Sequence, residues 1–285
     1  GHRRPSVPMN RFMEVVSKII FDCVGVPKLK KPLCFLLDID GTLLDDDGMY
    51  FTVFQRLLTP HGHDVTDEWY EKNVHGKADK EVFSTLMPAG TDLKAIAKKK
   101  DNLFVEVYTA HVEKNGPPVI KGLADAFALA ESLGIRACAV TNAPRGAAEA
   151  CIASLKASIP AAKIIEGLVI GEECERPKPF PEPYLAGMDL LGVTADDCVV
   201  FEDSRSGTKA GVAAKCHVVG IRSSLKESDL QAVGANLTLN DWSELDVNFL
   251  NMLMELPVST RDPKLISRRS ITAQSLNAPP PVPAS

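Results

Sequence analysis

The sequence has no long apolar run, no excess of positive charge and no paired cysteine motif. None of its apolar stretches approaches the roughly 20 residues that a membrane-spanning helix needs. The formal net charge of −5 and the pI of about 5.7 argue against a surface for nucleic acid or anionic lipid. We therefore expect a small-molecule partner, no nucleic acid and no membrane, and we expect the chain to be a monomer.

The seven cysteines form no CxxC pair, and most lie inside apolar runs such as LCFLLD and DCVVFED. This distribution favours buried thiols in a reducing compartment over a disulfide framework. The opening residues show no secretory signal. We expect a cytoplasmic location. The chloroplast is the alternative if the residues before Met9 are the remainder of a cleaved transit peptide.

The composition, 45% hydrophobic and 24% charged, is typical of a globular protein with a sizeable core. From residue 120 onward, apolar β-branched segments alternate with segments of helical spacing, which predicts an α/β fold with a doubly wound parallel sheet. The expected strands are 33–38, 135–141, 163–171, 197–203, 217–221 and 236–239, with a last helix around 241–254. We divide the chain into an extension with an amphipathic helix (1–30), an α/β core (31–49 and 120–256), an all-helical insertion (50–119) and a disordered tail (257–285).

The stretch LLDIDGTLLDDD, residues 36–47, places five aspartates in ten positions directly after a strand of apolar residues. Asp38 and Asp40 lie two apart at the carboxyl end of this strand, where open α/β sheets bind their ligands, so we expect both carboxylates to converge on one spot. Asp46 and Asp47 fit a solvated turn, because DDDG is an ordinary turn sequence.

Polar residues also follow the other strands. Thr141 and Asn142 precede a helix start that is suited to phosphate, although they could simply cap that helix. Lys178 lies between two prolines that would fix its direction, and a surface lysine is the alternative. Glu202 and Asp203 end a buried strand. Because unpaired buried carboxylates are unfavourable, we expect a hard divalent cation there, with Mg²⁺ as the common choice at phosphate sites.

Four segments carry a family resemblance: DIDGTLLD, TNAP, RPKPFPEPY and FEDSRSGTKAGVAA. In order and spacing they resemble the four motifs of the haloacid dehalogenase superfamily of phosphatases and mutases. The resemblance covers roughly residues 33–240 and implies a Rossmann-like core. The helical insertion is similar to the cap of the β-phosphoglucomutase-like subfamily, and the AVTNAP segment looks most like plant-type sugar-phosphate phosphatases.

The resemblance implies a role for each polar residue. Asp38 would be the nucleophile that forms an aspartyl-phosphate, and Asp40 the general acid and base. Thr141, the Asn142 amide and Lys178 would hold the phosphoryl oxygens. The Mg²⁺ ligands would be Asp38, the Asp40 carbonyl and Asp203, with Glu202 as a further ligand or a neighbour of the ligands. In the cap, His75, Gly76 and Lys77 match a segment that faces the substrate in relatives, although Gly76 and Lys77 could also be a helix start and a solvent lysine.

The expected activity is that of a Mg²⁺-dependent phosphatase acting on a small phosphorylated sugar or related metabolite. A sugar-phosphate mutase is the first alternative. Mutases carry a histidine twelve residues after the nucleophile, however, and the residue there is Tyr50, which cannot easily shuttle a proton near neutral pH. A phospho-accepting receiver-like module is the second alternative, disfavoured because its acidic pair would precede the acceptor aspartate.

Overall fold

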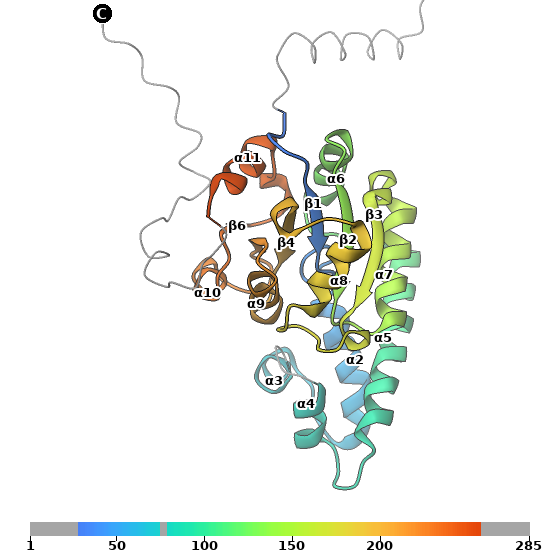
Figure 1. The fold of residues 1–285 in the computed structure, drawn as a ribbon. Helices are drawn as coiled ribbons and strands as arrows, with labels where there is room; N and C mark the ends of the chain where they lie inside the picture. The colour runs from blue at the N-terminus through green and yellow to red at the C-terminus, as the bar shows by residue number, and fades with distance from the viewer. Residues whose placement is uncertain (1–27, 75–78, 258–285) are drawn as a thin grey trace, which may run out of the picture.

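The computed structural model describes residues 28–74 and 79–257 (Figure 1). The amphipathic helix predicted at 11–22, the predicted cap contacts His75, Gly76 and Lys77, and the tail from 258 onward lie outside the described residues. No helix in the described ranges combines the length and the apolar character that crossing a bilayer requires.

The described chain folds around one sheet whose strands are all parallel, in the order β3-β2-β1-β4-β5-β6. This confirms the predicted doubly wound parallel sheet. Its centre is the strand that carries the aspartate motif. The strands are β1 (Cys34–Leu37), β2 (Arg136–Thr141), β3 (Ile165–Ile170), β4 (Cys198–Glu202), β5 (His217–Ile221) and β6 (Leu237–Leu239).

Both faces of this sheet are covered, which explains why its strands are nearly continuous apolar runs. Because side chains alternate along a strand, Phe35 of β1 packs into the larger core with Phe127 of α6. Its neighbour Leu36 packs on the opposite face with Tyr184 of α8. The helices of the core are α6 (Leu123–Ser132), α7 (Arg145–Ser158), α8 (Glu182–Leu191), α9 (Arg205–Ala213), α10 (Glu227–Ala232) and α11 (Val247–Glu255).

The insertion after β1 is helical in its described residues. It comprises α2 (Asp47–Leu58), a 3-10 turn (Thr59–His61), α3 (Asp67–Asn73), α4 (Asp79–Leu86) and α5 (Leu93–Asn115). Its residues Phe54, Tyr70 and Phe83 belong to an apolar cluster of their own, whereas Phe104 on α5 joins the larger core. Figure 1 shows α3 and α4 below the sheet, on the side toward which β1 points. The division at residues 49/50 and 119/120 remains a prediction; α2 runs across its first boundary.

The predicted start of the last helix, near residue 241, is wrong. Residues 242–244 form a separate 3-10 turn, in which the Asp241 carboxylate accepts a hydrogen bond from Ser243 N–H at 2.9 Å. Helix α11 then begins at Val247, where Asp246 accepts from Phe249 N–H at 2.7 Å. Two side-chain caps, each able to start a helical segment, divide what the apolar spacing presents as one helix.

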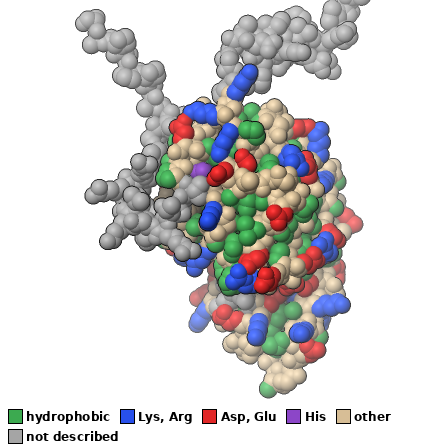
Figure 2. Space-filling view, viewed as in Figure 1, with side chains coloured by type: hydrophobic (Ala, Val, Ile, Leu, Met, Phe, Trp, Pro, Cys, Tyr) green, Lys and Arg blue, Asp and Glu red, His purple; other side chains and the backbone are tan. Residues whose placement is uncertain are grey.

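The surface in view carries both signs of charge. Figure 2 shows lysine and arginine side chains interspersed with aspartate and glutamate on this face, and apolar side chains gathered over the region where α8 lies. Leu185 and Leu190 of α8 are among the exposed large hydrophobic residues. The described residues on this face form no concentrated basic patch.

Candidate active site

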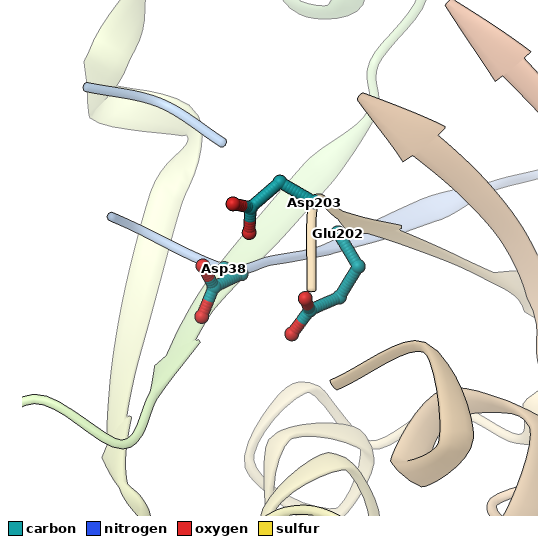
Figure 3. A group of neighbouring side chains, drawn as sticks. All are labelled: Asp38, Glu202 and Asp203. Atoms are coloured by element: carbon teal, nitrogen blue, oxygen red, sulfur yellow. The ribbon is translucent and has the colours of Figure 1, made fainter. Parts of the chain in front are cut away.

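Three buried carboxylates meet at the carboxyl edge of the sheet (Figure 3). Asp38 follows β1, and Glu202 and Asp203 lie at the end of the neighbouring strand β4. Each offers a carboxylate oxygen, and these oxygens lie within 4.8 Å of one another. The Asp38 N–H donates to the carbonyl of Phe201 at 3.1 Å, which ties the two strand ends together. Asp38 therefore lies close to Asp203, as the sequence predicts.

Lys178 lies among these acids with a side chain that is only 2% exposed. Its ammonium donates to Asp38 Oδ1 at 2.6 Å, to Glu202 Oε1 at 2.7 Å and to the Val140 carbonyl at 2.7 Å. Burial opposes the charged form, but Asp38 and Glu202 raise the pKa of Lys178 above its usual value. The surface-lysine interpretation is excluded.

The loop that carries Lys178 is anchored to the end of β2. The side-chain amide of Asn142 donates to the Lys178 carbonyl at 3.1 Å and accepts from the Lys178 N–H at 3.2 Å. Gly171 permits this approach, since a Cβ there would overlap Asn142 Oδ1. The Asn142 side chain thus orients Lys178, and its main-chain amide as a phosphate contact stays a prediction.

Glu202 is fully buried and has hydrogen-bond partners on both oxygens. Besides Lys178, Oε1 accepts from the Tyr184 hydroxyl at 2.8 Å. Oε2 accepts from the Ser204 N–H at 3.2 Å and the Ser204 hydroxyl at 2.8 Å. Helix α9 approaches so closely that a Cβ on Gly207 would overlap the whole carboxylate. These four hydrogen bonds fix the Glu202 carboxylate, and the fixed carboxylate in turn holds the Lys178 ammonium in place.

Asp203 is less completely satisfied. The Ser224 hydroxyl donates to Oδ2, and the Thr42 hydroxyl reaches Oδ1 only at 3.4 Å. Gly41, at φ +70°, lies against this carboxylate, where any Cβ would overlap Oδ2. Burial, and then the charge of Glu202, raise the pKa of Asp203 to about 7. The same two causes, in the same order, raise the pKa of Asp38 well above its usual value.

This charge balance fits a divalent cation. When ionised, the three carboxylates carry −3 and Lys178 supplies +1, so −3 + 1 leaves −2 in a buried space. Such an excess is unfavourable unless a cation accompanies it. The donors are all hard oxygens, which suits Mg²⁺ rather than a thiophilic metal.

Asp40 lies beside this group, half-buried, with two long contacts. The Tyr50 hydroxyl is 3.4 Å from Oδ1, and the Thr141 hydroxyl is 3.4 Å from Oδ2. Thr141 also accepts from the Ala143 N–H at 2.9 Å, so it caps the turn that follows β2 in addition to facing Asp40. Asp38, Asp40, Thr141, Lys178 and Asp203 are thus assembled at one sheet edge.

A model of the haloacid dehalogenase-like hydrolases matches residues 35–221, which span every residue of this assembly. The chain belongs to that family. Among its relatives, hexitol phosphatase A of Escherichia coli is 31% identical over 216 residues, covering 75% of this chain and 93% of that protein. Protein CbbY of Rhodobacter capsulatus is 26% identical over 239 residues, covering 78% and 97%. With several relatives named as phosphatases, this haloacid dehalogenase-like chain is a phosphoric monoester hydrolase.

Solved structures agree on the fold. A CbbY variant from Rhodobacter sphaeroides, in complex with xylulose-(1,5)bisphosphate, superposes with a TM-score of 0.63 at 23% identity. The match covers 75% of this chain and 96% of that one. At this identity the likeness supports the haloacid dehalogenase-like fold and nothing more specific.

The structure corrects one interpretation of the aspartate motif. Asp46 is not solvated: it is 2% exposed and lies beside Asp40, whereas Asp47 is exposed as expected. A turn aspartate and an inward-facing one have the same sequence pattern. Two residues that hold Glu202, Tyr184 and Ser204, are not among the predicted site residues. The position of Tyr184 on the sheet-facing side of α8, six residues after Lys178, is the one signal that indicates it.

Proposed function

We propose that this chain is a Mg²⁺-dependent phosphatase that hydrolyses a small phosphorylated sugar through an aspartyl-phosphate on Asp38. The observation that carries the proposal is the buried contact of Asp38 with Lys178 at 2.6 Å, in a group of oxygens that also includes Asp203. This arrangement combines a fixed carboxylate, a fixed ammonium and a place for a cation. Phosphoryl transfer needs mainly such positioning and charge neutralisation.

In the first step, an oxygen of Asp38 forms a bond to phosphorus while the bond from phosphorus to the sugar oxygen breaks. Asp40 gives its proton to the departing sugar oxygen. In the second step, Asp40 takes a proton from water, the water oxygen attacks the phosphorus, and the Asp38–phosphorus bond breaks to release inorganic phosphate. Lys178, the Thr141 hydroxyl and the Asn142 main-chain amide hold the phosphoryl oxygens throughout.

The residues that would hold Mg²⁺ are Asp38, Asp203 and the main-chain carbonyl of Asp40. When bound, the ion supplies positive charge next to the phosphoryl oxygens. Since Glu202 already accepts four hydrogen bonds, we assign it to orienting Lys178 and not to direct ligation. Lys178 in turn fixes one oxygen of Asp38, so the orientation of the nucleophile is set by a chain of buried contacts.

The sugar class rests on the relatives. One is named a hexitol phosphatase and another a phosphorylated carbohydrates phosphatase, from Thermotoga maritima. The helices α3 and α4 lie beyond the edge of the sheet where the site is, so their surface is suited to contacting the substrate. His75, Gly76 and Lys77 remain our predicted cap contacts.

Tyr50 favours hydrolysis over a mutase reaction. Its hydroxyl contacts Asp40, and burial together with the Asp40 charge raises the pKa of Tyr50 well above its usual value. A phenol in this state neither gains nor loses a proton near neutral pH. A receiver-like module is disfavoured by the family match and by the long helical insertion after the first motif.

The test is a panel of hexose and hexitol phosphates, each incubated with Mg²⁺ or with EDTA. We expect inorganic phosphate only with Mg²⁺, and loss of turnover in Asp38→Asn with an unchanged circular dichroism spectrum. Asp45→Asn, an exposed aspartate of the same motif, is the matched control and should keep wild-type turnover. Turnover by Asp38→Asn or in EDTA would reject the proposal, and conversion of a hexose 1-phosphate to its isomer would favour the mutase.

A further inference from the structure

The carboxylate of Asp203 has fewer close partners than that of its neighbour Glu202. Two side-chain hydroxyls reach Asp203 in the described structure. The Thr42 hydroxyl lies 3.4 Å from Oδ1, beyond the roughly 2.5 to 3.0 Å of a good O–H···O hydrogen bond. The Ser224 hydroxyl is the close donor, and it binds Oδ2. Ser224 is therefore the side chain that can hold this carboxylate in one orientation.

Ser224 belongs to the loop between β5 and α10, and the two residues before it fix this loop in place. The Arg222 N–H donates to the Leu239 carbonyl at the end of β6, at 2.9 Å. The Ser223 hydroxyl donates to the Gly41 carbonyl, in the turn of the first aspartate motif. The loop is thus attached both to the sheet edge and to the first motif directly before Ser224.

Gly41 brings the first motif, the end of β4 and this loop into contact. A Cβ built on Gly41 would lie 2.2 Å from Asp203 Oδ2 and 3.0 Å from Ser224 Oγ, so both groups pack against its bare main chain. Because Oδ2 is occupied in this way, Oδ1 is the oxygen that remains for a cation. Figure 3 shows the Asp203 carboxylate next to that of Asp38, and the two offer oxygens within 4.8 Å of one another.

We propose that Ser224 is a positioning residue of the Mg²⁺ site: its hydroxyl holds the Asp203 carboxylate in the orientation in which Asp203 binds the ion. This inference rests on the Mg²⁺ site of the proposed function. A group that hydrogen-bonds to a metal ligand orients that ligand before the ion arrives, and its removal typically weakens metal binding by about 10- to 100-fold. The loop after β5 thereby becomes part of the metal site without supplying a ligand.

Calorimetric titration of the metal-free protein with MgCl₂ measures this binding directly, without substrate. We expect Ser224→Ala to bind Mg²⁺ about tenfold or more weakly than wild type. Ser224→Thr, which keeps the hydroxyl at an exposed position, should recover most of the loss. Ser228→Ala is the matched control and should bind like wild type, because Ser228 is an exposed serine of α10 with no side-chain hydrogen bond in the described structure.

Turnover of 4-nitrophenyl phosphate separates positioning from a general disturbance of the site. Once bound, the ion itself holds Asp203, so excess Mg²⁺ should compensate for the missing hydroxyl. For Ser224→Ala we expect the Mg²⁺ concentration that gives half-maximal turnover to rise about tenfold or more, while kcat at saturating Mg²⁺ stays within about threefold of wild type. A variant with a disturbed fold would instead lose kcat at every Mg²⁺ concentration.

Three results would each overturn the positioning role: unchanged Mg²⁺ affinity in Ser224→Ala, a threonine variant as weak as the alanine variant, or a loss of kcat that excess Mg²⁺ does not restore. Failure of the proposed function has a different signature. If wild type binds no Mg²⁺ or is not activated by it, both the proposed function and this inference are rejected. If Asp203→Asn loses Mg²⁺ binding and Ser224→Ala does not, the metal site stands and only the role of Ser224 is rejected.

Discussion

Gly207→Ala tests whether the buried arrangement of Glu202 and Lys178 depends on the absence of a side chain at position 207. Gly207 lies in the first turn of α9, and a Cβ built there would overlap Cδ, Oε1 and Oε2 of Glu202. Glu202 has no exposed surface and accepts from Lys178, Tyr184 and Ser204, so it can move only by giving up some of these hydrogen bonds. The added methyl group must displace either this carboxylate or helix α9.

Both responses are costly. Moving Glu202 separates it from Lys178, and breaking a buried ion pair costs about 3–5 kcal/mol. Moving α9 disturbs a close contact, because Gly211 already faces Val218 and Val200, and overpacking of this kind costs about 1–3 kcal/mol. Because the protein relaxes by the less costly of the two responses, we expect the free energy of unfolding to fall by about 1–3 kcal/mol, out of a typical total of about 5–15 kcal/mol. Turnover should fall about 100-fold, since a misplacement of about 1 Å at a reacting group has that effect.

Gly146→Ala is the matched control. Gly146 lies in the first turn of α7, and a Cβ there meets no heavy atom within 4 Å. The same substitution should therefore stabilise the protein by up to about 1 kcal/mol, through helix propensity alone. Urea unfolding followed by circular dichroism measures the stabilities, and release of 4-nitrophenolate measures the turnover. A Gly207→Ala protein as stable and as active as Gly146→Ala would refute the reasoning.

Three further predictions concern the charges and one buried hydrogen bond. In EDTA at pH 8, the midpoint of thermal unfolding of Asp38→Asn should lie about 2–6 °C above that of wild type, because the substitution removes one of three crowded carboxylates. An unchanged or lower midpoint would contradict this prediction. Mg²⁺ affinity measured by calorimetry should rise between pH 6 and pH 8. The folded-state pKa of Asp203 is raised to about 7, and this carboxyl group must lose its proton to bind the ion. Equal affinities at both pH values would argue against Asp203 as a ligand. Trp242→Phe should lower the free energy of unfolding, measured with urea, by about 1–3 kcal/mol. The indole N–H donates to the buried Thr42 carbonyl at 2.8 Å, and its loss leaves that carbonyl unsatisfied. An unchanged free energy of unfolding would mean that water replaces the indole.

Much of the site could be predicted because parallel strands place their carboxyl ends at one edge. Asp38, Thr141 and Asp203 each follow an apolar run, so their proximity depends only on strand order. The side on which a loop folds is harder to predict. Lys178 could be identified only from its place between prolines, and its burial depends on Asn142, which is distant in sequence.

Residues whose role depends on the direction of one side chain could not be predicted. Asp45, Asp46 and Asp47 are chemically identical, yet only Asp46 is buried, because the turn into α2 directs it inward. Likewise, nothing in the local pattern around Ser224 indicates that its hydroxyl reaches Asp203. The start of the last helix is equally hard to predict, since Asp241 and Asp246 can both cap a helical segment within one apolar run.

The long sequence separations within the site bear on how the enzyme is made. Lys178 contacts Asp38 across 140 positions, and the hydroxyl that binds Asp203 comes from Ser224, beyond β5. A ribosome-bound chain that has not yet exposed Ser224 has its nucleophile but lacks the full set of groups around it. The enzyme should therefore gain its activity late in synthesis, after the segment that carries Ser224 has left the ribosome and folded against the end of β4.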